Sequence, residues 1–513
     1  MTAVAQGYFL GRTLGEDSVC LFGEDRPGIR VLPPAAFLEA ADRYDLVVNV
    51  DSLTEMAAET AAAYCGAIKA RAGVFLSINH EGNPFTVQEV CAKVGMPLMS
   101  RAPYWLRRGY VEEVANCALT ATKRLHMSVP SPAIVWTLAR PPISTLPELS
   151  VTQRQAFADG RNLVERVQAA YRAAVRGYAA SNSGWDVTVG EIKHPIHEAL
   201  LSSSPEPATT LLRDPANNSH FWGFDAVCKA PEGEIEPHEL VLRRLDDHAD
   251  WKQSYARWLH DALISLAEAV GIHRTFYPET APGFHYELFG EPANVDRILD
   301  GIETTVGAPI QFPNPYAGEL GLCTGRRGIA SFRAIQAIYQ AWRLRQLSKG
   351  QSEFRVLEIG AGLGRTAYFA HQFGILDYTI VDIPLTNAAQ GYFLGQTLGQ
   401  DKIGLFGESY GQQTTRILPP GSIEDMTETF DVVLNVDSFT EMPIETMASY
   451  WRFARSNADS VLSINHELNA HRVCELYVGD PAVHFCRSPY WMRRGYVEEY
   501  ITWKHRKPRH PVI

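Results

Sequence analysis

The residues best suited to chemistry surround one glycine-rich turn. An apolar run at 356–359 is typical of a buried parallel strand, and Gly360, Gly362 and Gly364 follow it at alternate positions. Glycine lets the backbone turn tightly and brings a ligand close to the main chain. The helix predicted next would point its N-terminus at that ligand. A second strand ends at Asp382, whose carboxylate can accept hydrogen bonds from two ribose hydroxyls, so this chemistry is nucleoside binding.

The spacing of the glycines distinguishes between nucleosides. A dinucleotide site prefers G-x-G-x-x-G, whereas this chain has G-x-G-x-G, with Arg365 where the third dinucleotide glycine would fall. The acidic Glu358 also precedes the first glycine. The pattern resembles motif I of class I S-adenosylmethionine (SAM)-dependent methyltransferases, which implies that Glu358 and the glycines meet the methionine part of SAM. The alternatives are a nicotinamide oxidoreductase, disfavoured by Arg365, and a turn that binds no ligand.

Polar residues follow the next two predicted strands. In a doubly wound sheet, ligands bind at the carboxyl ends of the strands, where Asp437 and His466 lie. Methyl transfer to an alcohol requires that the alcohol lose its proton, and imidazole accepts a proton near neutral pH. We expect His466 to act as the base and Asp437 to orient the imidazole or the acceptor hydroxyl. The alternative is a strand-end histidine without a chemical role, which the counterpart His80 favours because it occurs where no glycine turn exists.

The same strand ends could hold a metal ion. Asp437 and Glu467 offer carboxylate oxygens, with Asn465 or Glu441 as a further ligand, and oxygen ligands suit Mg²⁺. Some sugar and catechol methyltransferases bind magnesium with acids at these two strand ends. We expect a site without a metal, and Mg²⁺ at Asp437 and Glu467 is the alternative.

Four further residues are candidates for binding the acceptor. Glu441 follows the Asp437 strand end, Tyr490 could stack on a sugar ring, and Arg494 could hold a phosphate, because arginine forks match phosphate oxygens. Arg327, in a glycine-rich loop, is a candidate anchor for a diphosphate. The alternative is that Tyr490 belongs to the core and that the arginines face solvent.

The composition describes an ordinary globular protein. Its 513 residues are too many for one core, 46% are hydrophobic, 20% are charged, and the formal net charge is −11 without a block of lysine or arginine. Binding to nucleic acid is therefore not expected. The N-terminus lacks a signal-peptide pattern, no apolar run could span a membrane, and the eight cysteines form no C-x-x-C pair. We expect a cytoplasmic protein with reduced thiols and no membrane partner.

Parts of the C-terminal region recur near the N-terminus. Four segments return in the same order from residue 389 onward, at 5–11, 46–52, 76–81 and 103–110. The chain begins at a point equivalent to about residue 385, so this first copy has neither the glycine turn nor the acid after the second strand. We therefore expect residues 1–115 to form a partial repeat that does not bind SAM by itself. Three explanations stay open, namely that segments from the middle of the chain fill the gap, that this copy is a degenerate remnant, or that the native start lies upstream.

These features predict an α/β chain of three parts. Residues 351–513 would form a Rossmann-like SAM-methyltransferase domain, and residues 1–115 its partial duplicate. Residues 116–350 carry apolar residues at helical spacing. We expect this mostly helical region to cap the catalytic domain, contact the substrate or mediate a homodimer.

Five motifs carry a closer resemblance, and they are VLEIGAGLG, VDIP, NVDSFTEM, SINHE and SPYWMRRGYVEE. With the helical region before them, they resemble the bacterial sugar O-methyltransferase family over about residues 215–506. The resemblance implies O-methylation of a sugar hydroxyl in a nucleotide sugar, a glycoside of a natural product or a surface glycan. A non-catalytic duplicated scaffold and an O-methyltransferase of a small non-sugar acceptor are the alternatives.

Overall fold

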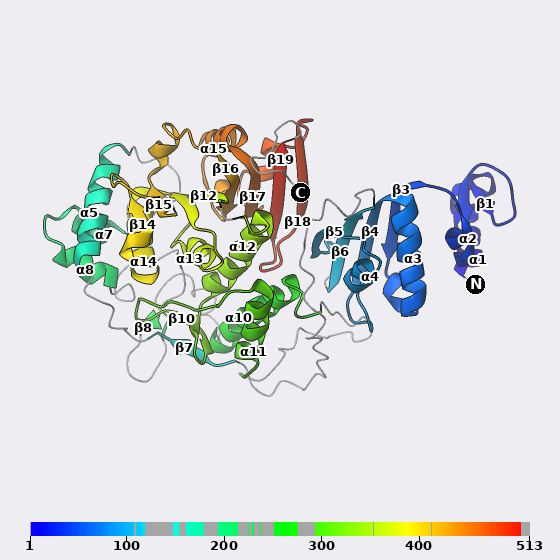
Figure 1. Ribbon diagram of the computed structural model, residues 1–513, viewed down its shortest axis with the longest axis horizontal. Helices are drawn as coiled ribbons and strands as arrows, with labels where there is room; N and C mark the ends of the chain where they lie inside the picture. The colour runs from blue at the N-terminus through cyan, green and yellow to red at the C-terminus, as the bar shows by residue number, and fades with distance from the viewer. Residues whose placement is uncertain are drawn as a thin grey trace.

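The computed structural model describes residues 2–106, 109–117, 147–152, 161–178, 193–213, 224, 228–229, 236–237, 251–274, 293–351, 353–411 and 413–503. Figure 1 shows a large C-terminal unit and, beside it, a smaller unit built by the N-terminal elements. None of the helices among these residues is long and apolar enough to cross a membrane.

An eight-stranded sheet forms the centre of the C-terminal unit. Its strands are β12 (Arg355–Ile359), β13 (Asp377–Val381), β14 (Ile403–Leu405), β15 (Thr415–Leu418), β16 (Phe430–Val436), β17 (Ala458–His466), β18 (Val483–Pro489) and β19 (Tyr496–Trp503). They lie in the order β14-β15-β13-β12-β16-β17-β19-β18, and β19 is antiparallel to both neighbours. The order reverses at β12, where a ligand site is expected. The predicted Rossmann-like α/β fold is confirmed.

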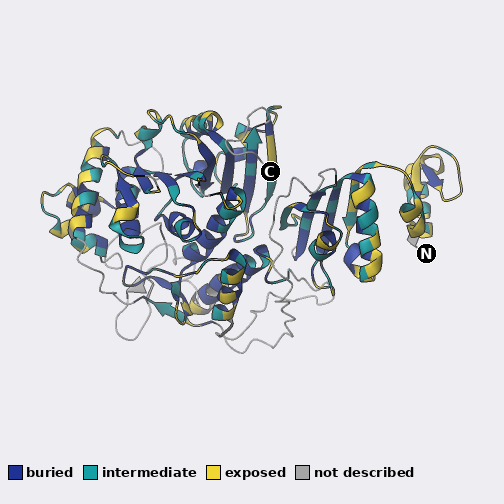
Figure 2. Ribbon diagram, in the orientation of Figure 1, coloured by how far each residue is buried: buried dark blue, intermediate teal, exposed yellow. Residues whose placement is uncertain are grey.

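Helices cover both faces of this sheet. They are α12 (Phe332–Ser348), α13 (Arg365–Gln372), α14 (Pro384–Thr397) and α15 (Ile444–Asn457). Successive strand residues point to opposite faces, so Val356 packs in the core with α12, α13 and α14, whereas Leu357 packs in the core with α15. Figure 2 shows the strands as mostly buried, as expected for parallel strands covered on both faces.

The region between 116 and 350 is mostly helical where it is described. Its helices are α5 (Arg161–Arg176), α7 (His194–Leu201), α8 (Glu206–Arg213), α10 (Trp251–Ala269) and α11 (Ala293–Val306). Its strands are β7 (Leu149–Val151), β8 (Cys228–Lys229), β9 (Glu236–Pro237), β10 (Leu320–Thr324) and β11 (Gly328–Ala330). Because α5 packs on α14 and α10 packs on α12, this region and one face of the C-terminal sheet share a hydrophobic core.

The first copy forms a sheet of its own. Its elements are α1 (Thr2–Leu14), β1 (Val19–Leu21), β2 (Ile29–Val31), α2 (Pro34–Glu39), β3 (Tyr44–Val50), α3 (Ala58–Arg71), β4 (Ala72–His80), α4 (Val87–Lys93), β5 (Leu98–Pro103) and β6 (Tyr110–Asn116). The order β3-β4-β6-β5 repeats the order β16-β17-β19-β18. The register also repeats, because His80 pairs with Tyr110 as His466 pairs with Tyr496.

The first copy has no counterparts of β12 and β13. Strand β3 therefore lies at an edge of its sheet, and its Leu46, Val48 and Val50 are each more than half exposed. The unit of α1, β1 and β2 lies apart from this sheet (Figure 1). Its Tyr8 and Phe9 are exposed, although the corresponding pair in α14 is buried. No described strand from the middle region fills the gap.

Candidate functional site

The glycine turn between β12 and α13 packs closely against Ser438, which follows the end of β16. Gly360 has a φ of +75°, and a Cβ at this position would lie 2.2 Å from Oγ of Ser438. The amide of Gly360 donates a hydrogen bond to the carbonyl of Val381 at 3.0 Å, and the Ser438 hydroxyl donates to the carbonyl of Ile359 at 2.9 Å. Glycine is required here, because any side chain would meet Ser438 and the positive φ disfavours other residues.

A cavity of about 390 Å³ runs from this turn to the end of β16, a volume typical of small-molecule sites. On one side it is lined by Glu358, Gly360, Gly362 and Asp382, which were predicted to bind the cofactor, whereas Gly364 caps α13 and is not among the lining residues. On the other side it is lined by Asp437 and Glu441, which were predicted to meet the acceptor. The fold therefore brings the two predicted halves of the site into one cavity.

Asp382 directly follows β13 and lines the cavity. Its Oδ1 accepts a hydrogen bond from the amide of Ile383 at 2.8 Å, and its Oδ2 accepts one from Nε2 of Gln390 at 2.8 Å. Burial raises the pKa of Asp382 to about 7, although these hydrogen bonds act in the opposite direction. A carboxylate fixed at the cavity wall in this way can accept further hydrogen bonds from a ribose.

Glu358 lies in β12, directly before the turn, and is 1% exposed. The hydroxyl of Tyr378 on β13 donates a hydrogen bond to its Oε2 at 2.8 Å. Burial raises the pKa of Glu358 to about 8, against the effect of that hydrogen bond. A positively charged ligand group next to Glu358 would favour its ionised form, as expected for the methionine end of SAM.

Arg365, which occupies the third dinucleotide glycine position, supports the turn. It begins α13, and its Nη2 donates a hydrogen bond to Oε1 of the fully buried Glu319 at 2.6 Å. Glu319 in turn accepts a hydrogen bond from Nδ2 of Asn314 at 3.0 Å. The glycine-rich segment before α12 thus holds the start of α13 through a buried ion pair.

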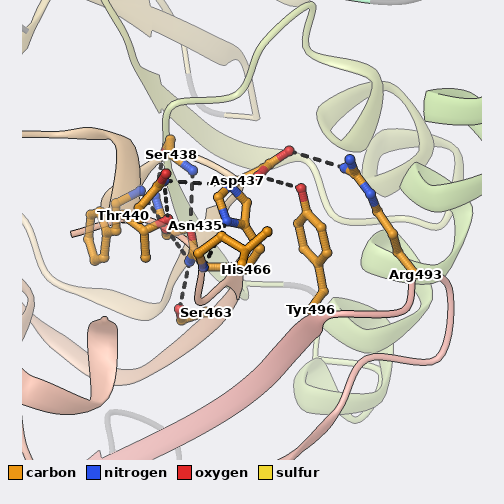
Figure 3. A network of polar contacts seen from close by, with 12 residues as sticks. Asn435, Asp437, Ser438, Thr440, Ser463, His466, Arg493 and Tyr496 are labelled. Atoms are coloured by element: carbon orange, nitrogen blue, oxygen red, sulfur yellow. Dashed lines mark hydrogen bonds and ion pairs between the residues drawn. The ribbon is translucent and has the colours of Figure 1, made fainter. Parts of the chain in front are cut away.

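Asp437 is the centre of a charged cluster at the end of β16 (Figure 3). The hydroxyl of Tyr496 donates to its Oδ1 at 2.8 Å, while Arg333 and Arg493 donate to its Oδ2 at 3.1 and 3.4 Å. Burial raises the pKa of Asp437, but the two guanidinium groups and the tyrosine hydroxyl outweigh this effect, so the pKa lies below its ordinary value. Asp437 is therefore a carboxylate at neutral pH, and it lines the cavity.

His466 is not among the residues that line the cavity. Its Nε2 is 3.8 Å from Oδ1 of Asp437, and its Nδ1 accepts a hydrogen bond from the amide of Leu468 at 3.3 Å. With Nδ1 accepting, the proton of the neutral imidazole is on Nε2, on the side of Asp437. This geometry favours Asp437 over the predicted base, His466, as the group that meets the acceptor.

Two buried asparagines tie the strand ends together. Nδ2 of Asn435 donates to the carbonyl of Ile359 at 2.9 Å, and Nδ2 of Asn465 donates to Oδ1 of Asn435 at 2.8 Å. The amide of Ser438 donates to Oδ1 of Asn465 at 3.1 Å. These side chains satisfy buried polar groups of β12, β16 and β17, so the repeated asparagines are explained by the fold.

The first copy contains a similar network without a glycine turn. Its Asp51 accepts a hydrogen bond from Tyr110 at 2.9 Å and lies 3.8 Å from Nε2 of His80. Asp51 has a φ of +52°, as Asp437 has a φ of +53°. The aspartate, histidine and tyrosine are therefore a feature of the fold in both copies. Arg333 differs, because it comes from α12, and the first copy contains no counterpart of this helix.

Asp437, Glu441 and His466 are arranged so that one possible ligand atom of each lies within 4.8 Å of the others. The magnesium alternative named Asp437 and Glu467, with Asn465 or Glu441 as a further ligand, but Glu467 forms an ion pair with Arg487. The carboxylate of Asp437 already has two guanidinium groups beside it, and their charge opposes a divalent cation. The geometry thus favours the expectation of a site without a metal.

Two predicted substrate-binding residues need correction, and a third, Arg494, is not among the residues that line the cavity. Tyr490 is 4% exposed and belongs to the core, so it cannot stack on a sugar. Arg327 is 2% exposed and forms ion pairs with three acids of α11, so it is not available to a diphosphate. Arg494 is exposed, and its neighbour Arg493 contacts the aspartate of the site instead. Of the four candidates, Glu441 lines the cavity.

Sequence reasoning missed the residues that α12 brings to the cavity. Arg333, Gln336 and Gln340 of this helix line it, as do Tyr178 and Phe224 of the middle region. Polar residues three and four positions apart share one face of a helix, and this spacing was a signal for Arg333, Gln336 and Gln340. The predicted site residues were confined to strand ends and loops, so this signal was not used.

The strand order and the turn define the class of fold. A dinucleotide-binding sheet has the order 3-2-1-4-5-6 with mostly parallel strands. Here, an antiparallel strand, β19, is inserted between β17 and the edge strand β18. This arrangement, with the glycine turn at the point where the strand order reverses, is the class I methyltransferase variant of the Rossmann-like fold.

The chain matches no known protein family and no curated protein. Many solved structures match part of it, including the following three. An O-methyltransferase from Bacillus cereus in complex with SAH is 12% identical over 33% of this chain and 80% of that chain, with a TM-score of 0.25. Magnesium protoporphyrin IX methyltransferase from Synechocystis PCC 6803 with bound SAM is 14% identical over 34% and 80%, with a TM-score of 0.25. The plantazolicin methyltransferase in complex with SAH is 8% identical over 34% and 85%, with a TM-score of 0.24.

Likenesses at these identities and TM-scores carry no conclusion about activity. By their names, the last two neighbours methylate chemically different molecules, a porphyrin and plantazolicin. The activity and the acceptor of this chain therefore have to be argued from its own cavity.

Proposed function

We propose that this chain is a SAM-dependent O-methyltransferase that acts on a sugar hydroxyl. The observation that carries the proposal is the single cavity that joins the glycine turn and Asp382 to Asp437. A methyl donor held at the turn and a hydroxyl held at Asp437 would meet inside that cavity. A cytoplasmic location is part of the proposal, supported by cysteines that form no disulfide in the described part of the chain.

Three features of the chain fit SAM. Gly360 lets a ligand approach the backbone of the turn, Glu358 supplies a buried carboxylate for the cationic methionine end, and Asp382 supplies acceptors for the ribose hydroxyls. When bound, SAM supplies a methyl group on a positively charged sulfur, which a nucleophilic oxygen can take. The task left to the protein is to align that oxygen and to remove its proton.

The acceptor side of the cavity can perform this task. Asp437 is charged at neutral pH because Arg333 and Arg493 stabilise its carboxylate, and it can accept a hydrogen bond from the acceptor hydroxyl. Asp437 would take the proton that the acceptor hydroxyl loses when its oxygen receives the methyl group supplied by bound SAM, which would leave a methyl ether and the demethylated cofactor. The hydrogen bond from the Tyr496 hydroxyl holds the carboxylate in position, and the imidazole of His466 lies beside it.

A polyhydroxylated acceptor suits this lining. Arg333 and Gln336 offer hydrogen-bond donors, and Asp437 and Glu441 offer acceptors. A sugar presents both kinds of partner, and a nucleotide sugar would add phosphates that match a guanidinium group. A small phenol has a single hydroxyl and would make fewer hydrogen bonds with these side chains. The lining therefore supports a sugar over the alternative of a small non-sugar acceptor.

Transfer of a labelled methyl group from SAM to a panel of nucleotide sugars and glycosides tests the proposal. We expect one sugar hydroxyl to be methylated. A chain that binds SAM but methylates only phenols or carboxylates would support the alternative acceptor. A chain that binds no SAM would support the duplicated scaffold, whose fold is retained without catalysis.

Activity is expected to survive the removal of divalent cations. The carboxylate of Asp437 is already neutralised by two guanidinium groups, so the acceptor needs no metal to bind there. The rate is measured after dialysis against EDTA, with and without added Mg²⁺. A loss of activity that Mg²⁺ restores would show that Asp437, Glu441 and His466 hold a metal.

SAM is expected to bind more tightly as the pH rises from about 6 to about 8.5. Burial raises the pKa of Asp382 to about 7 and that of Glu358 to about 8, so both carboxyl groups are largely protonated at the lower pH. Only the ionised forms neutralise a cation and accept hydrogen bonds with both oxygens. Calorimetric titration across this range measures the Kd, and Asp382→Asn should flatten the change near pH 7. An affinity independent of pH would contradict the raised pKa values.

A further inference from the structure

The first copy contacts the C-terminal sheet through equivalent edges. Strand β5 lies beside β18 (Figure 1). The two strands correspond in the repeat, since β5 pairs with β6 in the same antiparallel manner as β18 pairs with β19. A surface that contacts its own equivalent is the property of a two-fold symmetric dimer.

The contacts across this boundary are reciprocal. The guanidinium group of Arg101 lies 5.1 Å from the ring centroid of Trp491, and that of Arg487 lies 5.3 Å from the ring centroid of Trp105. In the repeat, Arg101 corresponds to Arg487 and Trp105 corresponds to Trp491. Each cation–π contact is therefore the symmetry equivalent of the other, as at an isologous interface.

Each arginine is held by two acids of its own copy. Arg101 forms ion pairs with Glu81 at 2.8 Å and with Glu113 at 3.6 Å. The acids that pair with Arg487 are the corresponding ones, Glu467 and Glu499. The glutamate of the repeated Ser-Ile-Asn-His-Glu motif thus orients the arginine that stacks on the tryptophan of the other copy.

We propose that the first copy serves as a built-in second subunit. The outer strand β18, with Arg487 and Trp491, forms a pairing surface. This surface fits the equivalent surface of a second C-terminal sheet across a two-fold axis, and in this chain the first copy occupies it. The first copy keeps the strands that build this surface and lacks those that form the glycine turn. Its contact also covers a sheet edge that would otherwise be open to other chains.

Hydrogen exchange in the full chain tests the contact. In Trp105→Ala, the cation–π contact between Trp105 and Arg487 is lost, and both β5 and β18 become easier to open. Amide exchange is therefore expected to become about tenfold faster in both 98–103 and 483–489. Trp491→Ala should have the same effect from the other side. Leu46→Ala is the control, because Leu46 is exposed on β3 at the opposite edge of the first copy's sheet. Unchanged exchange of 483–489 in Trp105→Ala would overturn the proposal.

Light scattering tests whether a second copy fits the surface. The unaltered chain should have the mass of one chain, since its pairing surface is covered. In Trp105→Ala, the first copy should leave the pairing surface formed by β18, Arg487 and Trp491. Two chains should then pair through this surface, so dimers should form as the concentration rises. The double variant with Trp491→Ala should stay monomeric. A Trp105→Ala chain that never dimerises would overturn the assignment of a two-fold pairing surface.

Discussion

Replacing Asp437 by asparagine is expected to lower turnover about a hundred- to ten-thousand-fold, the contribution typical of a positioned base. The amide keeps the size of the side chain and can still accept the hydrogen bond from Tyr496. It carries no charge, so it cannot take the proton of the acceptor hydroxyl, and Arg333 and Arg493 lose their ionic partner. SAM affinity should stay nearly unchanged, because Asp437 lies on the acceptor side of the cavity.

The chain provides a matched control for this experiment. Asp51→Asn changes the corresponding aspartate of the first copy, which has the same tyrosine and histidine neighbours. It should leave turnover unchanged, because no glycine turn lies nearby. His466→Ala should cost about tenfold in kcat, as expected for a residue that positions the carboxylate. If Asp437→Asn is fully active, or if His466→Ala alone abolishes turnover, the roles of Asp437 and His466 have to be exchanged.

Replacing Asp382 by alanine is expected to weaken SAM binding about ten- to a hundredfold, the effect of removing a charged hydrogen-bond partner. The carboxylate is lost as an acceptor for the ribose. In addition, Nε2 of Gln390, which donates to both Asp382 and the carbonyl of Gly362 at 2.8 Å, loses one of its partners next to the glycine turn. Both effects reduce the affinity for SAM and leave the residues on the acceptor side of the cavity unchanged.

Calorimetric titration of the full chain with SAM measures this effect. One site per chain is expected, because the first copy has no glycine turn, and the site should be strongly weakened in Asp382→Ala. Asp401→Ala is a suitable control, because its side chain is 79% exposed. An unchanged Kd would remove the assignment of Asp382 to the ribose. Two sites per chain would mean that the first copy also binds the cofactor.

The nucleoside half of the site could be predicted because its parts are neighbours in the chain. Residues 356–382 contain a strand, the glycine turn, a helix, a second strand and the acid in one unit. The connection between the two parallel strands of such a unit is almost always right-handed. Local periodicity and turn chemistry therefore placed Gly360 and Asp382 at one cavity before any tertiary contact was known. Self-similarity showed in the same way that the first copy lacks two central strands.

The acceptor half was predicted less well, because exposure and pairing are properties of the packed protein. Tyr490 and Arg327 looked like ligand-binding residues, but the first lies in the core and the second is surrounded by acids of α11. Arg333 was overlooked, because it lies on a helix and the predicted site residues were confined to strand ends and loops. Glu467 looked like a magnesium ligand, and the structure pairs it with an arginine at the boundary between the copies.

The class of fold, the glycine turn with its acid, and the duplication with its missing strands could all be read from the amino-acid sequence, because short-range patterns record them. The tertiary structure alone decided which distant side chains meet. Arg333 reaches Asp437 across 104 positions of the chain, and Arg101 of one copy stacks on Trp491 of the other. Such pairs depend on how helices and sheets pack against one another, and no local spacing of residues records that packing.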